Sequence, residues 1–332
     1  MSYTVLVTAP DLAPAGMQRL EESQCRVLFV QDAGNTEALE HLMASAPIDA
    51  VISRTVTLSG KAIAACPSLK VISKHGVGVN NIDVDVASAR GIPVFVTPGA
   101  NAQSVAELTL GLMFAAARKI TWMDGQLREG RWSRVQNGLQ MQGRTIGLVG
   151  FGQVAQRVAV VCMALGMRVL TFDTARRNGR PVSQVAFVAS LDALLAESDV
   201  LSLHVPLTAQ TRGMIGAAQL ALLPKGAIVI NTARGECIDE QALIEALQAG
   251  HLFAAGLDTM ALEPLPADSA LLRLSNIVLT PHVGGSTPAA LAAMADGAAR
   301  NILNFLRGET IDAAACVNPQ VLAPSSMTES IR

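Results

Sequence analysis

Four ionisable residues in the last third of the sequence have types that suit the chemistry of a 2-keto acid. Arg234, Asp258, Glu263 and His282 each stand at or just beyond the end of a short apolar run. Arginine binds a carboxylate and a carbonyl oxygen with a rigid fork of donors. Histidine gives and takes a proton near neutral pH, and a carboxylate partner stabilises its charged form and orients its ring. Arg234, Glu263 and His282 also have plain structural readings, as a solvated loop charge, a turn residue and a loop histidine.

The elements that must position these residues follow from apolar runs that alternate with helix-like segments. This alternation predicts parallel sheets covered by helices, with ligands bound beyond the carboxyl ends of the strands. The predicted strands are 4–9, 26–30, 49–53, 69–73, 92–96, 145–150, 168–173, 199–205, 227–232, 254–258 and 276–280. The predicted helices are 16–22, 36–46, 104–119, 288–307 and one that Asp239 begins and Gly250 ends, whereas 125–143 is expected to be irregular. Two α/β units of similar size, divided near residue 100, are therefore expected.

A glycine-rich turn follows the strand predicted at 145–150. The sequence GFGQVA places Gly150, Gly152 and Ala155 in the pattern G-x-G-x-x-G/A. The first glycine permits the tight turn, the second admits a pyrophosphate, and the small third residue lets the helix pack closely on the strand. The pyrophosphate would lie at the positive end of the helix that begins near Gln153. The pattern alone is a weak signal in a chain with 27 glycines.

The carboxylate at the end of the next predicted strand strengthens this interpretation. Asp173 follows the glycines by about 20 residues, the spacing at which an acidic side chain binds the adenosine ribose of a dinucleotide. Its charge also repels a 2′-phosphate, so NAD is favoured over NADP. Arg176 and Arg177 follow closely and leave the use of NADP open, because an arginine there can accept that phosphate.

Composition argues against several other classes of protein. The net charge is −2 and aromatic residues make up 3% of the chain, so neither a basic nor a stacking surface for nucleic acid is indicated. Half of the residues are hydrophobic, but the longest uncharged stretch, 274–295, contains two prolines and a histidine and cannot span a membrane. No secretory signal is visible at the N-terminus. The five separated cysteines form no metal-ligand pair, and free thiols in a cytoplasmic protein are the simplest expectation.

Several ordered motifs resemble the D-isomer-specific 2-hydroxyacid dehydrogenases, nearest the phosphoglycerate dehydrogenase-like branch. The motifs are GVGVNNIDVDVASARGIPVFVTPGANAQSVAEL (76–108), GLVGFGQVAQRVA (147–159), NTARGECIDEQAL (231–243), AAGLDTMALEPLP (254–266) and LTPHVGGST (279–287). The resemblance implies that Arg234, Glu263 and His282 are catalytic. It also implies two Rossmann-like or flavodoxin-like doubly wound parallel-sheet domains with the active site in the cleft between them.

The resemblance also implies the residues that bind the cofactor and the substrate. Asp258 is expected to hold the nicotinamide carboxamide, and Ser104 to lie against the cofactor. The full set expected at NAD is Gly150, Gly152, Gln153, Val154, Asp173, Pro206, Thr232, Ala233, Asp258, His282, Gly284, Gly285 and Ser104. The backbone amides near Val77 and Gly78 are expected to bind the substrate carboxylate together with Arg234.

The family topology implies a discontinuous substrate-binding domain, 1–100 plus 287–332, and an NAD-binding Rossmann domain, 101–286. Family members usually form homodimers through the nucleotide domain, and the region from Trp122 to Trp132 is the expected arm. The regulatory C-terminal domain of some phosphoglycerate dehydrogenases has no counterpart in the sequence, so serine feedback through such a domain is not expected.

The sequence does not choose the substrate. Arg54 and Lys74 follow predicted strands in the first third, and His75 adds a donor. If they face the cleft, the substrate carries a second anionic group, as phosphoglycerate does; if they are solvated charges, hydroxypyruvate or glyoxylate is equally suitable. Formate or phosphite dehydrogenases and NAD-sensing corepressors also use this scaffold and remain alternatives.

Overall fold

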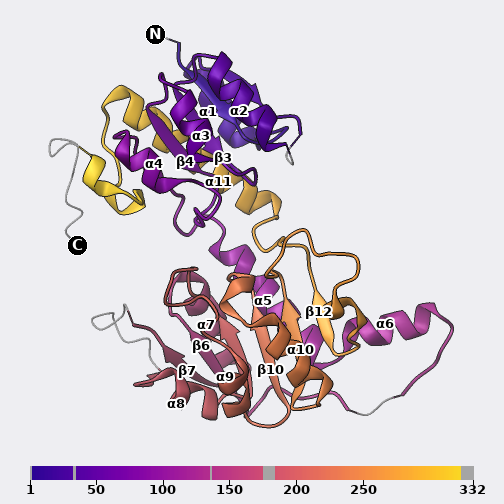
Figure 1. Ribbon diagram of the computed structural model, residues 1–332. Helices are drawn as coiled ribbons and strands as arrows, with labels where there is room; N and C mark the ends of the chain where they lie inside the picture. Colours follow the sequence, from indigo (N-terminus) through magenta and orange to yellow (C-terminus); the bar gives the residue numbers. More distant parts are fainter. Residues whose placement is uncertain (1, 33–34, 135–136, 175–183, 323–332) are drawn as a thin grey trace. The chain divides into compact units, whose positions relative to one another are not determined.

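The computed structural model describes residues 2–32, 35–134, 137–174 and 184–322. The chain divides into two compact units, which we call unit 1 (Met1–Asn101 and Ser286–Arg332) and unit 2 (Ala102–Gly285). Each unit contains one parallel sheet with helices on its faces (Figure 1), which confirms the predicted fold class. Arg176 and Arg177 lie outside the described residues.

Unit 1 is built on a five-stranded parallel sheet in the order β2-β1-β3-β4-β5. Alternate side chains enter opposite cores: Val5, Val7 and Ile52 pack on one face, and Leu6 and Val51 on the other. The strands are β1 (Thr4–Val7), β2 (Arg26–Phe29), β3 (Ala50–Ser53), β4 (Val71–Lys74) and β5 (Val94–Phe95). Helices α1 (Pro14–Glu22) and α11 (Pro288–Arg307) lie side by side on the first face, and α2 (Thr36–Ser45), α3 (Gly60–Ala65) and α4 (Val84–Ala89) pack on the second.

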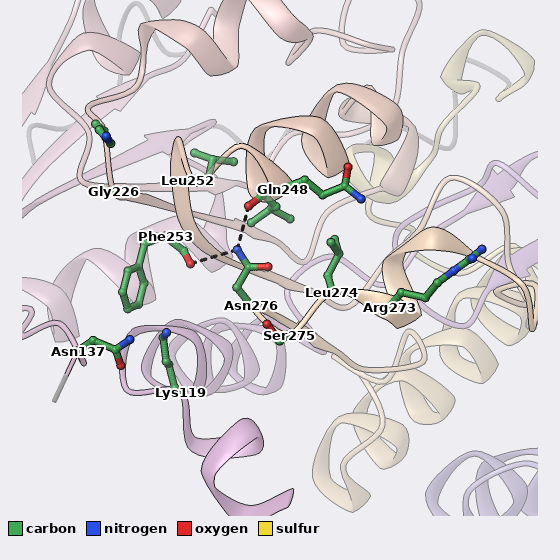
Figure 2. Close-up of a pocket in the computed structure, with 13 residues that line it drawn as sticks. Lys119, Asn137, Gly226, Gln248, Leu252, Phe253, Arg273, Leu274, Ser275 and Asn276 are labelled. Carbon is green, nitrogen blue, oxygen red and sulfur yellow. Dashed lines mark hydrogen bonds between the residues drawn. The ribbon is translucent and has the colours of Figure 1, made fainter. Parts of the chain in front are cut away.

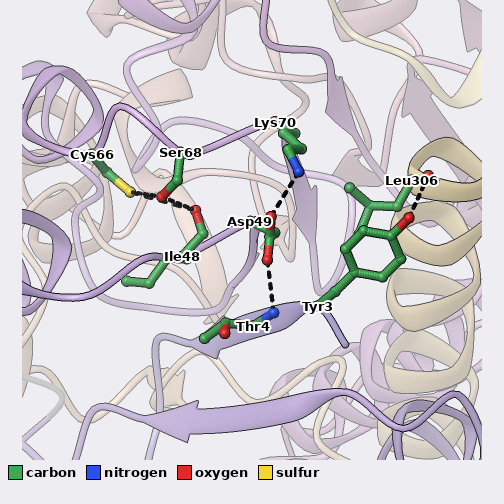
Figure 3. A network of polar contacts seen from close by, with 8 residues as sticks. All are labelled: Tyr3, Thr4, Ile48, Asp49, Cys66, Ser68, Lys70 and Leu306. Carbon is green, nitrogen blue, oxygen red and sulfur yellow. Dashed lines mark hydrogen bonds and ion pairs between the residues drawn. The ribbon is translucent and has the colours of Figure 1, made fainter. Parts of the chain in front are cut away.

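A polar network fixes the amino-terminal edge of this sheet (Figure 3). The Asp49 carboxylate accepts the Thr4 backbone N–H at 2.9 Å and the Lys70 ammonium at 2.8 Å. The Tyr3 hydroxyl donates to the carbonyl of Leu306 at 2.9 Å and so ties the end of α11 to the start of β1. These contacts join segments that are far apart in sequence. They lie at the edge of the sheet opposite the carboxyl edge, where the loops that follow the strands are found.

Unit 2 is built on a seven-stranded parallel sheet in the order β12-β11-β10-β9-β6-β7-β8. Its strands are β6 (Thr145–Val149), β7 (Arg168–Phe172), β8 (Val185–Phe187), β9 (Val200–Leu203), β10 (Ala227–Asn231), β11 (Leu252–Leu257) and β12 (Ile277–Leu279). Every strand predicted from the apolar runs is present, within a few residues at its ends. The edge strand β8 was not predicted.

Helices cover both faces of the unit 2 sheet. Ile228 and Ile230 of β10 face the core beneath α5 (Ala102–Ala117) and α7 (Gln153–Ala164), and Val229 faces α8 (Leu191–Ala196), α9 (Ala217–Leu222) and α10 (Glu240–Gln248). Gly256 of β11 lets α5 approach closely, because a Cβ there would lie 3.0 Å from that of Leu112. Short 3₁₀ turns at Gly235–Cys237, Ala270–Arg273, Ala313–Ala315 and Pro319–Val321 complete the described structure.

Two predicted helices have the expected ends, whereas the region after α5 differs from the prediction. Asp239 caps α10 by accepting the Ala242 N–H at 3.1 Å, and α11 has the predicted bounds. The prediction that 125–143 is irregular was wrong at its start, because α6 (Ile120–Arg128) continues into it. An ion pair of 2.6 Å between Asp124 and Arg128, four residues apart, supports this last turn.

Among the described residues, no helix is both long enough and apolar enough to cross a membrane. All five cysteines, Cys25, Cys66, Cys162, Cys237 and Cys316, are free thiols. Within the same part of the chain, no cluster of three or more His, Cys, Asp and Glu side chains is arranged to hold a metal ion.

Candidate active site

The glycine-rich turn joins β6 to α7 in the geometry that a dinucleotide requires. Gly150 has φ +86°, and a Cβ on it would lie 2.9 Å from the carbonyl oxygen of His204. A Cβ on Gly152 would meet no atom within 4 Å, so open space lies beside the turn. Gly152 is also the N-cap of α7 and provides no side-chain cap, which leaves the first helical amides to a ligand. Ala155 is fully buried where α7 packs on the sheet.

Asp173 stands at the end of β7, beside the glycine-rich turn. Its Oδ2 accepts the Phe151 N–H at 2.6 Å, so the carboxylate is held next to Gly152. A helix N-terminus without a side-chain cap, the open space at Gly152 and this carboxylate fit the pyrophosphate and the adenosine ribose of NAD. When bound, NAD would be held by Gly150, Gly152 and the first residues of α7, Gln153 and Val154, and by Asp173.

The turn that carries His282 is built around one buried carboxylate. His282 has φ +54°, a left-handed conformation that few residues other than glycine adopt. Asp258, at the end of β11, is only 1% exposed. Its Oδ1 accepts hydrogen bonds from the Thr280 hydroxyl (2.7 Å) and the Val283 N–H (2.8 Å), and its Oδ2 accepts one from the Gly284 N–H (2.8 Å). The His282 N–H donates to the Asp258 carbonyl at 2.8 Å. Asp258 therefore fixes the imidazole position, and its predicted contact with the nicotinamide carboxamide stays a prediction.

His282 and Glu263 form a direct pair. Nδ1 of His282 lies 2.7 Å from Oε2 of Glu263, and Oε1 of Glu263 accepts the Met260 N–H at 3.0 Å. Burial by itself would raise the pKa of Glu263, but the hydrogen bond and charge of His282, the Met260 amide and the charge of Arg234 outweigh it and lower the pKa. The carboxylate is therefore ionised at neutral pH and accepts a proton of the imidazole. The other ring nitrogen, Nε2, is left to act on a substrate.

A local turn after β10 positions Arg234. The Asn231 side chain donates to the carbonyl of Arg234 at 2.8 Å and accepts the Ala233 N–H at 2.9 Å. Only glycine fits at the adjacent position 235, because a Cβ on Gly235 would lie 1.9 Å from the carbonyl carbon of Met260. The loops after β10 and β11 are thus pressed together, and the charge of Arg234 acts on Glu263. The three residues predicted to be catalytic lie together at the carboxyl edge of the unit 2 sheet.

The remaining residues expected at the cofactor lie around the same edge. Ser104 Oγ donates to the carbonyl of Gly284 at 2.5 Å, and the hydroxyls of Thr232 and Thr109 are 2.8 Å apart. The carbonyl of Pro206, in the loop after β9, accepts the hydroxyl of Thr211 at 2.7 Å. Ala233 follows Thr232 in the loop after β10, and Gly285 follows Gly284 in the turn after His282.

In unit 1, the residues expected to bind substrate lie at the carboxyl edge of the five-stranded sheet, with Lys74 at the end of β4 and the others in the loops that follow the strands. The Arg54 Nη1 donates to the Asp11 Oδ1 at 2.8 Å. The Lys74 ammonium donates to the carbonyl of Arg54 at 2.5 Å and to Asn81 Oδ1 at 2.6 Å. Within the described residues, the backbone amides of Val77 and Gly78 donate to no protein acceptor. Two adjacent amides of this kind are suitable donors for a carboxylate.

His75 lies beside these cations and is 9% exposed. Burial, and then the positive charges of Arg54 and Lys74, lower its pKa to about 4, although backbone hydrogen bonds act in the opposite direction. The ring is therefore neutral at physiological pH. His75 cannot add a positive charge to the loops around it.

A cavity of about 650 Å³ in unit 2 is not part of this site. It is lined by Gly226, Leu252 and Asn276, which precede or begin strands β10, β11 and β12, and by Lys119 and Phe253 (Figure 2). These positions lie at the amino edge of the sheet, opposite the edge where ligands of doubly wound sheets bind.

Three residues around the candidate site were not predicted from the sequence. Asn231 holds the Arg234 turn, Asn81 accepts Lys74, and Asp11 pairs with Arg54. An asparagine at the end of an apolar run is a turn signal that could have identified Asn231. No local signal exists for Asp11 and Arg54, which are 43 positions apart.

Comparison with known proteins identifies the family. The family model described as "D-isomer specific 2-hydroxyacid dehydrogenase, NAD binding domain" matches residues 110–284. A hydroxypyruvate reductase of Thermotoga maritima is 44% identical over 246 residues, which cover 72% of this chain and 79% of that protein. A D-3-phosphoglycerate dehydrogenase of Archaeoglobus fulgidus is 40% identical over 289 residues, 86% of this chain but only 54% of that protein.

Solved structures agree with this assignment. The TT0316 protein of Thermus thermophilus superposes with a TM-score of 0.85 at 37% identity, over 95% of this chain and 99% of that one. The NAD⁺-bound 3-phosphoglycerate dehydrogenase of Entamoeba histolytica superposes with a TM-score of 0.81 at 26% identity, over 96% and 99% of the two chains. The protein therefore belongs to the D-isomer-specific 2-hydroxyacid dehydrogenase family and is an NAD-dependent oxidoreductase.

Proposed function

We propose that the protein interconverts a D-2-hydroxy acid and its 2-keto acid, with Arg234, Glu263 and His282 as the catalytic residues. The observation that carries this proposal is the 2.7 Å pair of His282 and Glu263 at the carboxyl edge of the NAD-binding sheet. Hydride transfer to a ketone leaves negative charge on its oxygen, which must receive a proton. A histidine held by an ionised carboxylate is suited to supply that proton.

Each residue has a distinct role in the reduction. NADH, when bound, supplies the hydride. Arg234 binds the substrate carboxylate and polarises the keto oxygen, which a planar guanidinium does through two parallel donors. His282 donates the proton from Nε2 to that oxygen. Glu263 accepts the Nδ1 proton in a hydrogen bond, orients the ring and stabilises its charged form. In the oxidation direction, His282 takes the hydroxyl proton.

The backbone amides of Val77 and Gly78 are proposed to bind a substrate carboxylate. Their exposed loop and their lack of acceptors among the described residues support this role. The relatives named hydroxypyruvate reductase, glyoxylate reductase and D-3-phosphoglycerate dehydrogenase indicate small 2-keto acids as the substrate class.

Steady-state oxidation of NADH with glyoxylate, hydroxypyruvate, 3-phosphohydroxypyruvate and pyruvate tests the proposal. At least one keto acid should be reduced, and chiral analysis should find the D-hydroxy acid. Absence of turnover with every keto acid, together with tight NADH binding, would support a binding protein such as an NAD-sensing corepressor instead.

Formate oxidation is the rival reaction within the fold, and the same assay run with NAD⁺ and formate tests it. Formate gives up a hydride to leave carbon dioxide and has no hydroxyl proton to be removed. The His282–Glu263 pair would have no proton to transfer in that reaction, so the pair favours a hydroxy acid. Rapid turnover of formate would contradict this assignment.

We also propose that the protein forms a homodimer through α6 and the residues that follow it. No residue of α6 is buried, and Ile120 (53%), Leu127 (54%) and Trp132 (76%) are exposed apolar side chains. Sedimentation should find a dimer that Leu127→Glu weakens. Thr121→Glu, which adds the same charge at an exposed polar position of the helix, should leave it intact.

A further inference from the structure

We propose that Asp11 is a specificity-determining residue that disfavours substrates with a second anionic group. Its carboxylate neutralises Arg54, the cation that such a group would otherwise meet. The inference rests on the proposed function and narrows its substrate class to 2-keto acids whose remote end is uncharged.

The contact between Asp11 and Arg54 joins two loops at the carboxyl edge of the unit 1 sheet. Arg54 Nη1 donates both to Asp11 Oδ1 at 2.8 Å and to the Asp11 carbonyl at 3.2 Å. The Arg54 backbone N–H donates to Thr8 Oγ1 at 2.8 Å, so the loop after β3 is fixed to the loop after β1. The Arg54 side chain is only 22% exposed, whereas that of Asp11 is 81% exposed. Nη1 of the guanidinium is therefore engaged before any substrate arrives.

The other basic residues of this edge do not replace Arg54. Lys74 donates to the Arg54 carbonyl and to Asn81 Oδ1. Asn81 in turn donates to the carbonyls of Arg54 (3.0 Å) and Val56 (2.8 Å), so Lys74 and Asn81 together fasten the loop after β3 to the loop after β4. His75, with its pKa lowered to about 4 by burial and by the nearby cations, is uncharged. Asp11 therefore offsets the positive charge of Arg54 at this edge of the sheet.

A phosphate or second carboxylate would have to displace Asp11 from the guanidinium and then remain close to its charge. Like charges a few ångströms apart near a protein surface repel appreciably. A hydroxymethyl or hydrogen substituent, as in hydroxypyruvate or glyoxylate, does not meet this repulsion. Asp11 therefore selects against the anionic remote end and has little effect on the rest of the substrate.

The test compares hydroxypyruvate with its phosphate ester, 3-phosphohydroxypyruvate, because the two differ only at the remote end. Asp11→Asn keeps the size of the side chain and an oxygen acceptor but removes the charge. It should raise the ratio of kcat/KM for the phosphorylated substrate over hydroxypyruvate about tenfold, through KM and not kcat. In the double variant Asp11→Asn, Arg54→Met this gain should be lost, because the guanidinium is then missing.

Glu21→Gln is the matched control, because it removes one exposed negative charge near the C-terminal end of α1, the helix that follows Asp11. It should leave the ratio unchanged. An active wild-type protein whose ratio is the same in Asp11→Asn would overturn the inference and leave the proposed function standing. A wild-type protein that reduces neither these nor any other 2-keto acid would overturn both.

Discussion

A histidine follows the carboxyl end of a parallel strand in each unit, and the neighbours of the two histidines have opposite charges. His282 follows β12 in unit 2 and lies 2.7 Å from the Glu263 carboxylate. His75 follows β4 in unit 1 and lies beside the cations Arg54 and Lys74. The exposures differ as well, with 46% of the His282 side chain and only 9% of His75 accessible.

The comparison shows that the place of a histidine in an α/β fold does not determine its chemistry. An anionic partner and exposure make His282 able to carry and deliver a proton. Burial among cations makes His75 a neutral anchor that keeps its loop in place. The strand ends provide the positions, and the neighbouring charges decide what each position can do.

The largest expected effect separates the two histidines directly. His282→Ala should lower kcat for keto-acid reduction about 10²–10⁴-fold, because general acid catalysis typically contributes that much. Binding of NADH, measured by fluorescence titration, should be nearly unchanged. His75→Gln should keep kcat within a few-fold, and an equal loss of kcat in both variants would remove the distinction between them.

A second change tests the anionic group at the cofactor end of unit 2. Asp173→Ala should weaken NAD and relieve the repulsion of a 2′-phosphate, so the NAD preference, measured as a ratio of kcat/KM values, should fall roughly tenfold or more. Asp173→Asn is the companion variant, because its side-chain oxygen can still accept the Phe151 N–H and keep the glycine-rich turn in place. A change in cofactor preference in this variant therefore reports the loss of charge alone. Comparable kcat/KM with both cofactors in the unaltered protein would contradict the role given to Asp173.

Removing the anionic partner of His282 should have a milder effect than removing His282 itself. Glu263→Gln removes the carboxylate that accepts the Nδ1 proton and orients the imidazole ring. The kcat for keto-acid reduction should fall about tenfold with KM nearly unchanged. A kcat equal to that of the unaltered protein would mean that the pair is not needed for proton transfer.

The smallest effect is expected in the pH dependence of stability. The pKa of His75 is about 4 in the folded protein, against an ordinary value of 6.5. Between about pH 4 and pH 6.5, His75 is therefore protonated in the unfolded chain but neutral in the folded chain. Stability should therefore fall as pH drops from about 6.5 to about 4, by at most about 3 kcal/mol from this residue. His75→Gln should flatten the dependence of the urea midpoint over this range. A midpoint that varies with pH as steeply as before would contradict the assignment.

The fold could be predicted from the sequence because buried parallel strands are continuous apolar runs with polar ends. The runs at Thr145–Val149 and Ala227–Asn231 show this clearly. The strand Val185–Phe187 was missed because it is short, lies at the sheet edge and is largely accessible. The helix α6 was not predicted because two glycines obscured its pattern, although the spacing of Asp124 and Arg128 was a usable signal.

The candidate site could be predicted in part for a related reason. Strand ends place Arg234, Glu263 and His282 on one edge, and in a parallel sheet residues that follow strands gather there. The contacts that determine the chemistry of these three residues could not be predicted from the sequence. The left-handed turn at His282 depends on Asp258, and the neutralisation of Arg54 depends on Asp11, and both contacts join loops that only the fold brings together.

The pH profile of kcat/KM for hydroxypyruvate reduction, measured in parallel for the unaltered protein, His282→Gln and His75→Gln, tests most directly whether the partnered histidine is the proton donor. If His282 is the proton donor, the unaltered protein and His75→Gln should both show an alkaline limb, and His282→Gln should lose it and keep only a low residual rate. An alkaline limb that persists in His282→Gln, or one that disappears in His75→Gln, would contradict this role of His282.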